Sequence, residues 1–297
     1  MTPKQRLLTA INRGVPDRLP VTTHHVMPYF LNKYMGGMDA LTFHQTMGFD
    51  PIVWTCPIKP DSSEGQYLDE ATGILCSGDW RLETEEIPGQ PYLTKRFRFI
   101  TPRKSLTTVL QYNEYTLWQT EFLLKEKTDI DVIADFAPHP RCDVEAVNAL
   151  AGSVKEEALV RGSFTGFAPF GQPGCWQDAA CLYGIENLIL EAFDDPQWVS
   201  YTCEVLRRMK ETFIRSTKGA RFDILELGGG DASTTVISPE LFRRFVAPHD
   251  QQLVRLAHGR GAEGGLSYLR RHDANPGGYR GSERGRHGDL HPARHGG

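Results

Sequence analysis

The sequence predicts an α/β protein with a parallel sheet, and three observations support this fold class. Short apolar runs alternate with amphipathic helical segments along most of the 297 residues, as in βαβ units whose helices connect parallel strands. Residues 66–112 alternate apolar and polar positions instead, which is typical of antiparallel strands. No Gly-x-Gly-x-x-Gly follows the first expected strand, which disfavours an open dinucleotide-binding sheet. We therefore expect a (β/α)8 TIM barrel that is truncated at its C-terminal end and carries an inserted antiparallel β meander.

The first expected element is a short amphipathic helix near the N-terminus. Thr2 suits the N-cap and Pro3 the first helical position, and Gly14 follows the last apolar residue of the pattern. The elements expected next are a strand at 19–22, helices at 27–34 and 40–47, and a buried strand at 51–55.

The meander is expected because apolar and polar residues take turns over residues 92–99, between turns marked by glycine. Helical periodicity returns from Asn113, and Asp143 begins a helix that reaches about Leu150.

The clearest βα pattern lies in the second half of the chain. Strands are expected at 159–164 and 224–227, and helices at 184–193 and 196–213. The last helix, 238–258, begins with Ser at the N-cap, Pro at the first position and an acid in the first turn.

Composition excludes several classes of function. The formal net charge is -4 and the basic residues are scattered, so no nucleic-acid partner is expected. No apolar run approaches the roughly 20 residues of a membrane helix, and the N-terminus lacks an apolar signal core. We therefore expect a cytoplasmic protein without a membrane partner. The six cysteines form no Cys-x-x-Cys pair and are expected to be free thiols.

The composition changes near Gly261, which divides the chain into a core at 1–261 and an aberrant tail at 262–297. The tail has no Val, Ile, Phe, Met, Trp or Lys and is rich in Gly, Arg and His, so it could not bury further barrel units. It is expected to be either disordered or frameshifted. Codons for residues 266–274, read one base later, are compatible with Tyr-His-Thr-Cys-Gly-Gly-Met-Met-Pro, which favours the frameshift.

Two segments carry a resemblance to a known family. Residues 6–21 read RLLTAINRGVPDRLPV and resemble the N-terminal signature of the uroporphyrinogen decarboxylase superfamily. Residues 223–248 resemble its strand, Gly-rich loop and Ser-Pro-Glu helix. The superfamily also contains corrinoid-dependent methyltransferases, so the resemblance implies a barrel enzyme that acts on a small-molecule substrate.

The chain departs from the authentic decarboxylase. That enzyme carries an Arg-Gln-Ala-Gly-Arg motif after the first strand, which binds substrate carboxylates, whereas residues 22–28 here read TTHHVMP. The methyltransferase branch holds zinc with a His-x-Cys pair and a later Cys, and the printed chain has no His-x-Cys. No metal site or cofactor site is therefore expected to be intact. Zinc is expected only if the shifted frame, which contains His-Thr-Cys, is restored.

The favoured activity of the intact protein is zinc-assisted methyl transfer with a corrinoid protein as partner. The alternatives are decarboxylation of uroporphyrinogen or a related acid, and an inactive fragment. A homodimer is a further expectation, because missing strands would leave open sheet edges.

Active sites of such barrels lie at the carboxyl ends of the strands, and this rule selects the candidate residues. The candidate catalytic residues are Glu226, Asp231, His24 and His25. The candidate substrate-binding residues are Asp50, Thr165, Gly228, Gly229 and Gly230. Tyr183 is added because the family resemblance implies a tyrosine in this region of the pocket. Simpler interpretations remain open: the histidines as surface residues, Asp50 as a cap of the turn before Pro51, and the glycines as a tight connection.

Overall fold

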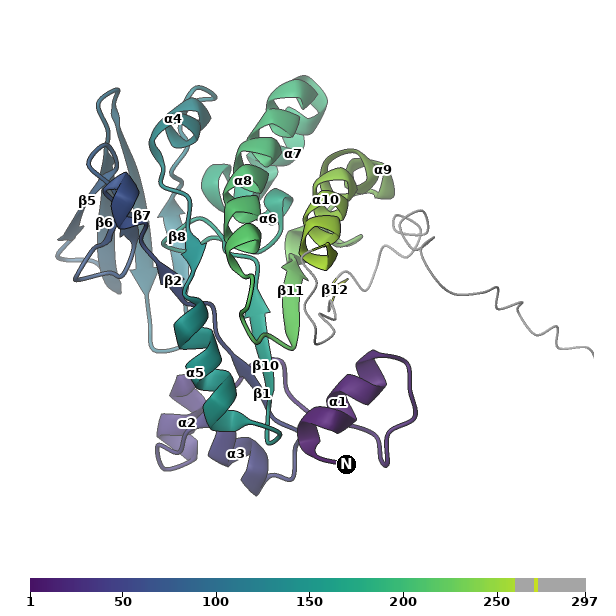
Figure 1. Cartoon of the computed structure of the whole chain (residues 1–297). Coiled ribbons are helices and arrows are strands. Elements are labelled where there is room, and N and C mark those ends of the chain that lie inside the picture. Colours follow the sequence, from purple (N-terminus) through teal and green to yellow (C-terminus); the bar gives the residue numbers. More distant parts are fainter. Residues whose placement is uncertain (260–269, 272–297) are drawn as a thin grey trace, which may run out of the picture.

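The computed structural model describes residues 1–259 and 270–271 (Figure 1). It confirms an α/β architecture around a parallel sheet with the strand order β1-β10-β11-β12. These strands are β1 (Ile52–Trp54), β10 (Leu159–Ser163), β11 (Ile224–Gly228) and β12 (Arg270–Arg271). The strand order follows the chain order without a reversal. The strands within the described residues do not close into a barrel.

Burial explains why β10 and β11 read as apolar runs. All five residues of β10 are buried, and in β11 only the central Glu226 is partly exposed. Strands buried on both faces are typical of parallel sheets covered by helices. The register places Ser163 opposite Glu226 and Arg161 opposite Ile224.

Helices cover this sheet and connect its strands (Figure 1). The N-terminal helices are α1 (Pro3–Ile11), α2 (Pro28–Tyr34) and α3 (Ala40–Thr46). The later helices are α4 (Asp129–Phe136), α5 (Val144–Val154), α6 (Cys175–Tyr183), α7 (Ile185–Asp194), α8 (Pro196–Ser216), α9 (Pro239–Leu241) and α10 (Ala247–His258). The long helix α8 packs against α6, α7 and α10, so it joins the helical layer into one unit.

The expected antiparallel meander is present, but it begins and ends later in the chain than the expected 66–112. It consists of β5 (Arg81–Glu86), β6 (Leu93–Ile100), β7 (Ser105–Tyr112) and β8 (Leu117–Glu121), in that order. The prediction that helical structure resumes at Asn113 was wrong, because the residues of β8 form a strand that pairs with β7. One face of the meander packs into the core, where Trp80 stacks on Phe99 with ring centroids 4.9 Å apart.

Short paired segments complete the connections. The antiparallel pairs are β2 (Ile58–Lys59) with β9 (Arg141–Cys142), and β3 (Tyr67–Leu68) with β4 (Leu75–Cys76). Single turns of 3-10 helix lie at Ser62–Glu64 and Gly230–Ala232.

The N-terminal segment confirms one expectation and corrects another. The side chain of Thr2 accepts from the backbone N–H of Gln5 in a capping box, as expected of an N-cap. The expected strand at 19–22 is not formed. This segment makes a backbone bond from Asp50 N to Val21 O of 2.6 Å, and an isolated bond of this kind does not build a strand ladder.

The expected helix at 238–258 is one helical run with a π-helical segment, Phe242–Val246, between α9 and α10. Pro248 follows this segment. Since proline lacks the N–H that would bond to the preceding turn, the wider π segment lets the helix continue past it.

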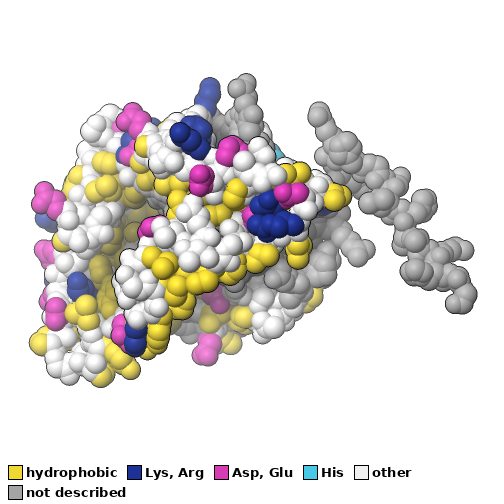
Figure 2. Space-filling view, turned by 90° about the horizontal axis from the view of Figure 1, so that it is seen from below, with side chains coloured by type: hydrophobic (Ala, Val, Ile, Leu, Met, Phe, Trp, Pro, Cys, Tyr) yellow, Lys and Arg dark blue, Asp and Glu magenta, His cyan; other side chains and the backbone are white. Residues whose placement is uncertain are grey.

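The surface seen from below Figure 1 has a hollow bordered by hydrophobic side chains, and basic and acidic side chains lie intermixed around it (Figure 2). No helix in the part of the chain that the structure describes has the length and apolar character to span a membrane. The frameshift hypothesis concerns residues outside the described part of the chain, apart from the backbone of 270–271.

Candidate functional site

A cavity of about 420 Å³ lies at the carboxyl ends of the parallel strands, and we call it the strand-end pocket. Trp54 at the end of β1, Ser163 at the end of β10 and Gly228 at the end of β11 all line it. Barrel enzymes and open α/β sheets both bind ligands at this end of their strands. The pocket therefore has the position that the sequence predicted for an active site.

Two predicted catalytic residues meet in this pocket, although they are 202 positions apart in the sequence. His24 Nε2 lies 3.1 Å from Glu226 Oε1. Arg161 Nε lies 3.5 Å from Glu226 Oε2, and Arg161 Nη1 donates to the backbone oxygen of His24 at 3.1 Å. The guanidinium is 4% exposed, the carboxylate 15% and the His24 side chain 42%. Arg161 therefore anchors the pair from inside, and His24 presents its ring to the opening.

His25 also lines the pocket. Partial burial lowers the pKa of His25 below its ordinary value, and the electrostatic influence of His24 and Arg161 lowers it further. At neutral pH the His25 ring is therefore uncharged and can accept a proton or a hydrogen bond.

The three glycines of the predicted site line the pocket, each in a different setting. Gly228 O accepts from the N–H of Gly174, the residue before α6. A Cβ on Gly229 would lie 1.9 Å from Gln177 Oε1, whereas a Cβ on Gly230 would meet nothing within 4 Å. Only glycine fits at position 229, and the space beside Gly230 is open to a ligand.

Asp231 follows the glycines but does not line the strand-end pocket. Its backbone oxygen accepts from the indole N–H of Trp176 at 3.2 Å. Burial raises the pKa of the Asp231 carboxyl above its ordinary value. This carboxyl group is next to the pocket, and its catalytic role stays a prediction.

The structure places Asp50 away from the pocket. Its carboxylate is fully buried and pairs with Arg6 at 2.5 Å and with Arg18 at 2.9 Å. It also accepts from Val21 N at 3.0 Å. These contacts occupy both carboxylate oxygens, so the interpretation of Asp50 as a structural residue before β1 fits better than substrate binding.

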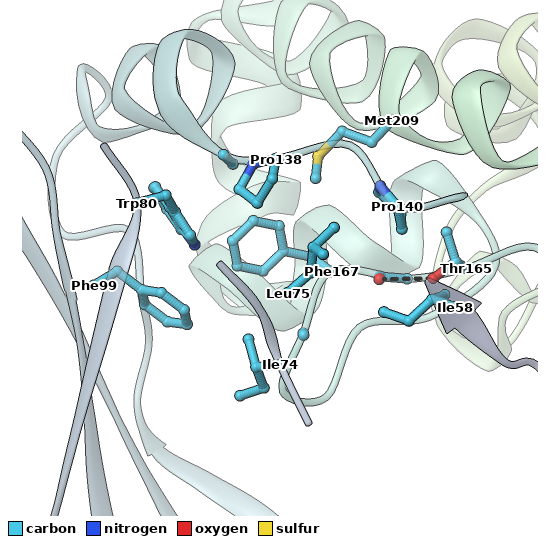
Figure 3. Close-up of a pocket in the computed structure, with 13 residues that line it drawn as sticks. Ile58, Ile74, Leu75, Trp80, Phe99, Pro138, Pro140, Thr165, Phe167 and Met209 are labelled. Carbon is cyan, nitrogen blue, oxygen red and sulfur yellow. Dashed lines mark hydrogen bonds between the residues drawn. The ribbon is translucent and has the colours of Figure 1, made fainter. Parts of the chain in front are cut away.

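Thr165 and Tyr183 also lie outside the strand-end pocket. Thr165 lines a separate cavity of about 60 Å³ between apolar side chains, which include Trp80, Phe99 and Phe167 (Figure 3). The Tyr183 hydroxyl donates to Glu191 at 3.4 Å, and its ring packs on Trp198 with centroids 4.8 Å apart. Thr165 follows the predicted strand at 159–164, whereas Tyr183 ends α6, and neither side chain lines the strand-end pocket.

Several pocket residues were not predicted. They are Trp54, Arg161, Ser163, Gly171, Gln172, Pro173 and Gln177. A signal for Arg161 was available, because a charged residue inside the apolar run at 159–164 requires a buried partner. The glutamines had no such signal, since amides occur throughout the chain.

Metal-ligand geometry is not present in the described residues: none of their His, Cys, Asp and Glu side chains form a group of three that could hold a metal ion. The chain as described therefore does not fit a zinc site, and no chemical step here uses zinc.

Comparisons with known proteins find distant structural neighbours among the solved structures. No family model and no curated protein match the sequence. A solved structure of a methyltransferase from Methanosarcina mazei is similar to 86% of this chain and 67% of its own, with 14% sequence identity and a TM-score of 0.47. A likeness this distant carries no argument about activity.

Proposed function

We propose that the chain belongs to an enzyme that acts on a small polar molecule in the strand-end pocket, with His24 and Glu226 as its proton-transfer pair. The observation that carries the proposal is the 3.1 Å contact between His24 Nε2 and Glu226 Oε1 inside a cavity of about 420 Å³. A carboxylate that orients an imidazole is a recurrent arrangement for general acid–base catalysis.

The reaction that we propose is methyl transfer, as in the corrinoid-dependent branch of the uroporphyrinogen decarboxylase superfamily. The motifs at 6–21 and 223–248 support the superfamily. The strand order supports its barrel fold, because consecutive parallel strands in chain order are typical of a (β/α)8 barrel, whereas a doubly wound sheet reverses its order. We propose that β1, β10, β11 and β12 belong to such a barrel.

The pocket residues suit proton delivery at the atom that loses the methyl group. Glu226 would hold the His24 ring, and protonated His24 would donate its proton to the departing heteroatom. His25, which is uncharged at neutral pH, would accept a hydrogen bond from the substrate. The open space beside Gly230 would admit the substrate close to the backbone.

The cavity has the volume of a small-molecule site, and we propose that a partner protein presents the corrinoid at the pocket opening. When bound there, the corrinoid would accept the methyl group. Zinc would be held only by a frame-restored chain. Resequencing the DNA from the codon for Arg243 to beyond Gly297 tests this point, since a one-base correction must yield His-Thr-Cys and a later cysteine.

Decarboxylation of uroporphyrinogen or a related acid is the second candidate. Among the described residues, Arg161 is the one arginine that lines the pocket, and it already contacts Glu226. A substrate with several carboxylates needs several arginines. This observation favours methyl transfer.

The test is an assay of the purified chain with reduced cobalamin and a panel of methylated amines, ethers and thiols, followed by corrinoid absorbance. We expect turnover that falls about 100-fold in Glu226→Gln, the typical loss when an acid–base group is removed. Glu240→Gln on the exposed start of α9 is the matched control and should keep full activity. Decarboxylation of uroporphyrinogen by the same preparation would overturn methyl transfer, and inactivity with every compound would favour an inactive fragment.

A further inference from the structure

An ion pair lies in the core between α6 and α8, outside the set of groups used above. Lys210 Nζ lies 2.6 Å from Asp178 Oδ2, and the two side chains are 1% and 2% exposed. Removing two charges from water is costly unless their other hydrogen-bonding groups are satisfied. The partners that satisfy them show what the pair holds in place.

Those partners all belong to one loop, residues 164–173, between β10 and α6. Lys210 Nζ donates to the backbone oxygens of Thr165 and Gln172, each at 2.9 Å. Asp178 accepts from the backbone N–H groups of Phe167 and Gln172 at 3.1 Å. The pair thus bonds to both limbs of the loop.

The two limbs of the loop approach each other closely at two glycines. A Cβ on Gly166 would lie 2.1 Å from the carbonyl carbon of Gly171, and a Cβ on Gly171 would lie 1.8 Å from Phe167 N. The two limbs are therefore in backbone contact, and only glycine permits it.

The loop separates two cavities. Gly171, Gln172 and Pro173 line the strand-end pocket. Gly166 and Phe167, on the other limb, line the apolar cavity beside Trp80 (Figure 3). A displacement of the loop would reshape the pocket without touching His24 or Glu226.

We propose that Lys210 and Asp178 are positioning residues, which fix loop 164–173 so that Gly171–Pro173 form one side of the substrate pocket. This role rests on the proposed function of the pocket. It makes the shape of the pocket depend on two residues of the helical layer that do not line it.

A second carboxylate offers a matched control. Asp129 is buried, accepts from the backbone N–H groups of Lys125 and Glu126, and pairs with Lys104. It holds the turn at 122–128, and neither it nor Lys104 lines the strand-end pocket. Breaking this pair removes a carboxylate–lysine interaction that does not contact loop 164–173.

The experiment is hydrogen exchange of the full chain, read by mass spectrometry on the peptide that covers 164–173. We expect exchange at Phe167 and Gln172 to be about tenfold faster in Lys210→Met and Asp178→Asn, because their N–H groups lose a charged acceptor or its anchor. Lys104→Met and Asp129→Asn should leave this peptide unchanged. Equal exchange in the two sets of variants would overturn the proposal.

The double variant Lys210→Met with Asp178→Leu separates positioning from stability. Apolar replacement of a buried pair often restores stability, but it leaves the loop N–H groups without their acceptor. We expect a thermal midpoint near that of the wild type together with fast exchange of the loop. If loop 164–173 in the double variant were as protected from exchange as in the wild type, Lys210 and Asp178 would only stabilise the fold, and the positioning role would be excluded. Neither result requires turnover, so a failed methyl-transfer assay would not be mistaken for failure of this proposal.

Discussion

Asp50 and Glu226 are two carboxylates on the same parallel sheet, and they differ in what surrounds them. Asp50 precedes the amino end of β1, is fully buried and contacts two arginines and a backbone N–H. Glu226 is the central residue of β11, contacts one arginine and one histidine, and lines a cavity. A carboxylate enclosed by its partners, as Asp50 is, stabilises the fold. A carboxylate that lines a cavity and contacts a partly exposed histidine, as Glu226 does, is available for chemistry.

The largest loss in the free energy of unfolding is expected when Asp50 is replaced. Asp50→Asn should lower the free energy of unfolding by about 3 kcal/mol, the lower end of the range for breaking a buried ion pair, because Arg6 and Arg18 lose their shared carboxylate. Glu226→Gln should cost about 1 kcal/mol, as for a partly exposed pair. Urea denaturation of both variants measures the difference, and equal losses would break the comparison.

The next effect concerns the glycines at the pocket. Gly229→Ala should destabilise the protein by about 2 kcal/mol through overpacking, since the new Cβ would lie 2.5 Å from the Cβ of Gln177 as well as against its amide. Gly230→Ala is the control, because its Cβ would meet nothing within 4 Å. A stability change of the same size in both variants would contradict the close packing at position 229.

The smallest effect is the pH dependence of stability. Burial lowers the pKa of His249 and of His139, and it is also the largest cause of the lowered pKa of His25. As the pH falls below about 6.5, the ordinary histidine pKa, the unfolded chain binds protons that the folded chain does not. The free energy of unfolding should therefore decrease on acidification through this window.

Urea titrations between pH 5 and pH 8 measure this decrease, and His249→Gln should flatten part of it. His25→Gln should flatten it less, since His25 is exposed and its charge is more strongly screened by solvent. A free energy of unfolding of the wild type that increases on acidification would contradict this prediction.

Local sequence patterns predicted most of the elements correctly. Apolar runs, caps and helical spacing predicted β10, β11, α7 and α8 to within a few residues. The errors lie where tertiary contacts override local pattern. β8 forms because it pairs with β7, and residues 19–22 stay out of the sheet because their contacts are made with Asp50.

The candidate site was predicted in part, for a similar reason. The rule that ligands bind at the carboxyl ends of strands selected His24, His25, Glu226 and the three glycines, and all of them line one pocket. The same rule selected Asp231, Asp50 and Thr165, which do not line it. Tyr183, chosen from the family resemblance, also lies elsewhere. Position in the chain shows which end of a strand a residue is near, but not which way its side chain points.

The sequence by itself determined the α/β class, the meander, the element order and the residue types at the strand ends, because these depend on the spacing of neighbours in the chain. The tertiary structure decided which of those residues meet. Arg161 approaches Glu226 because β10 and β11 are adjacent in the sheet, and Lys210 reaches Asp178 across 32 positions because α8 packs on α6. Contacts of this kind depend on how whole elements pack, which no local spacing specifies.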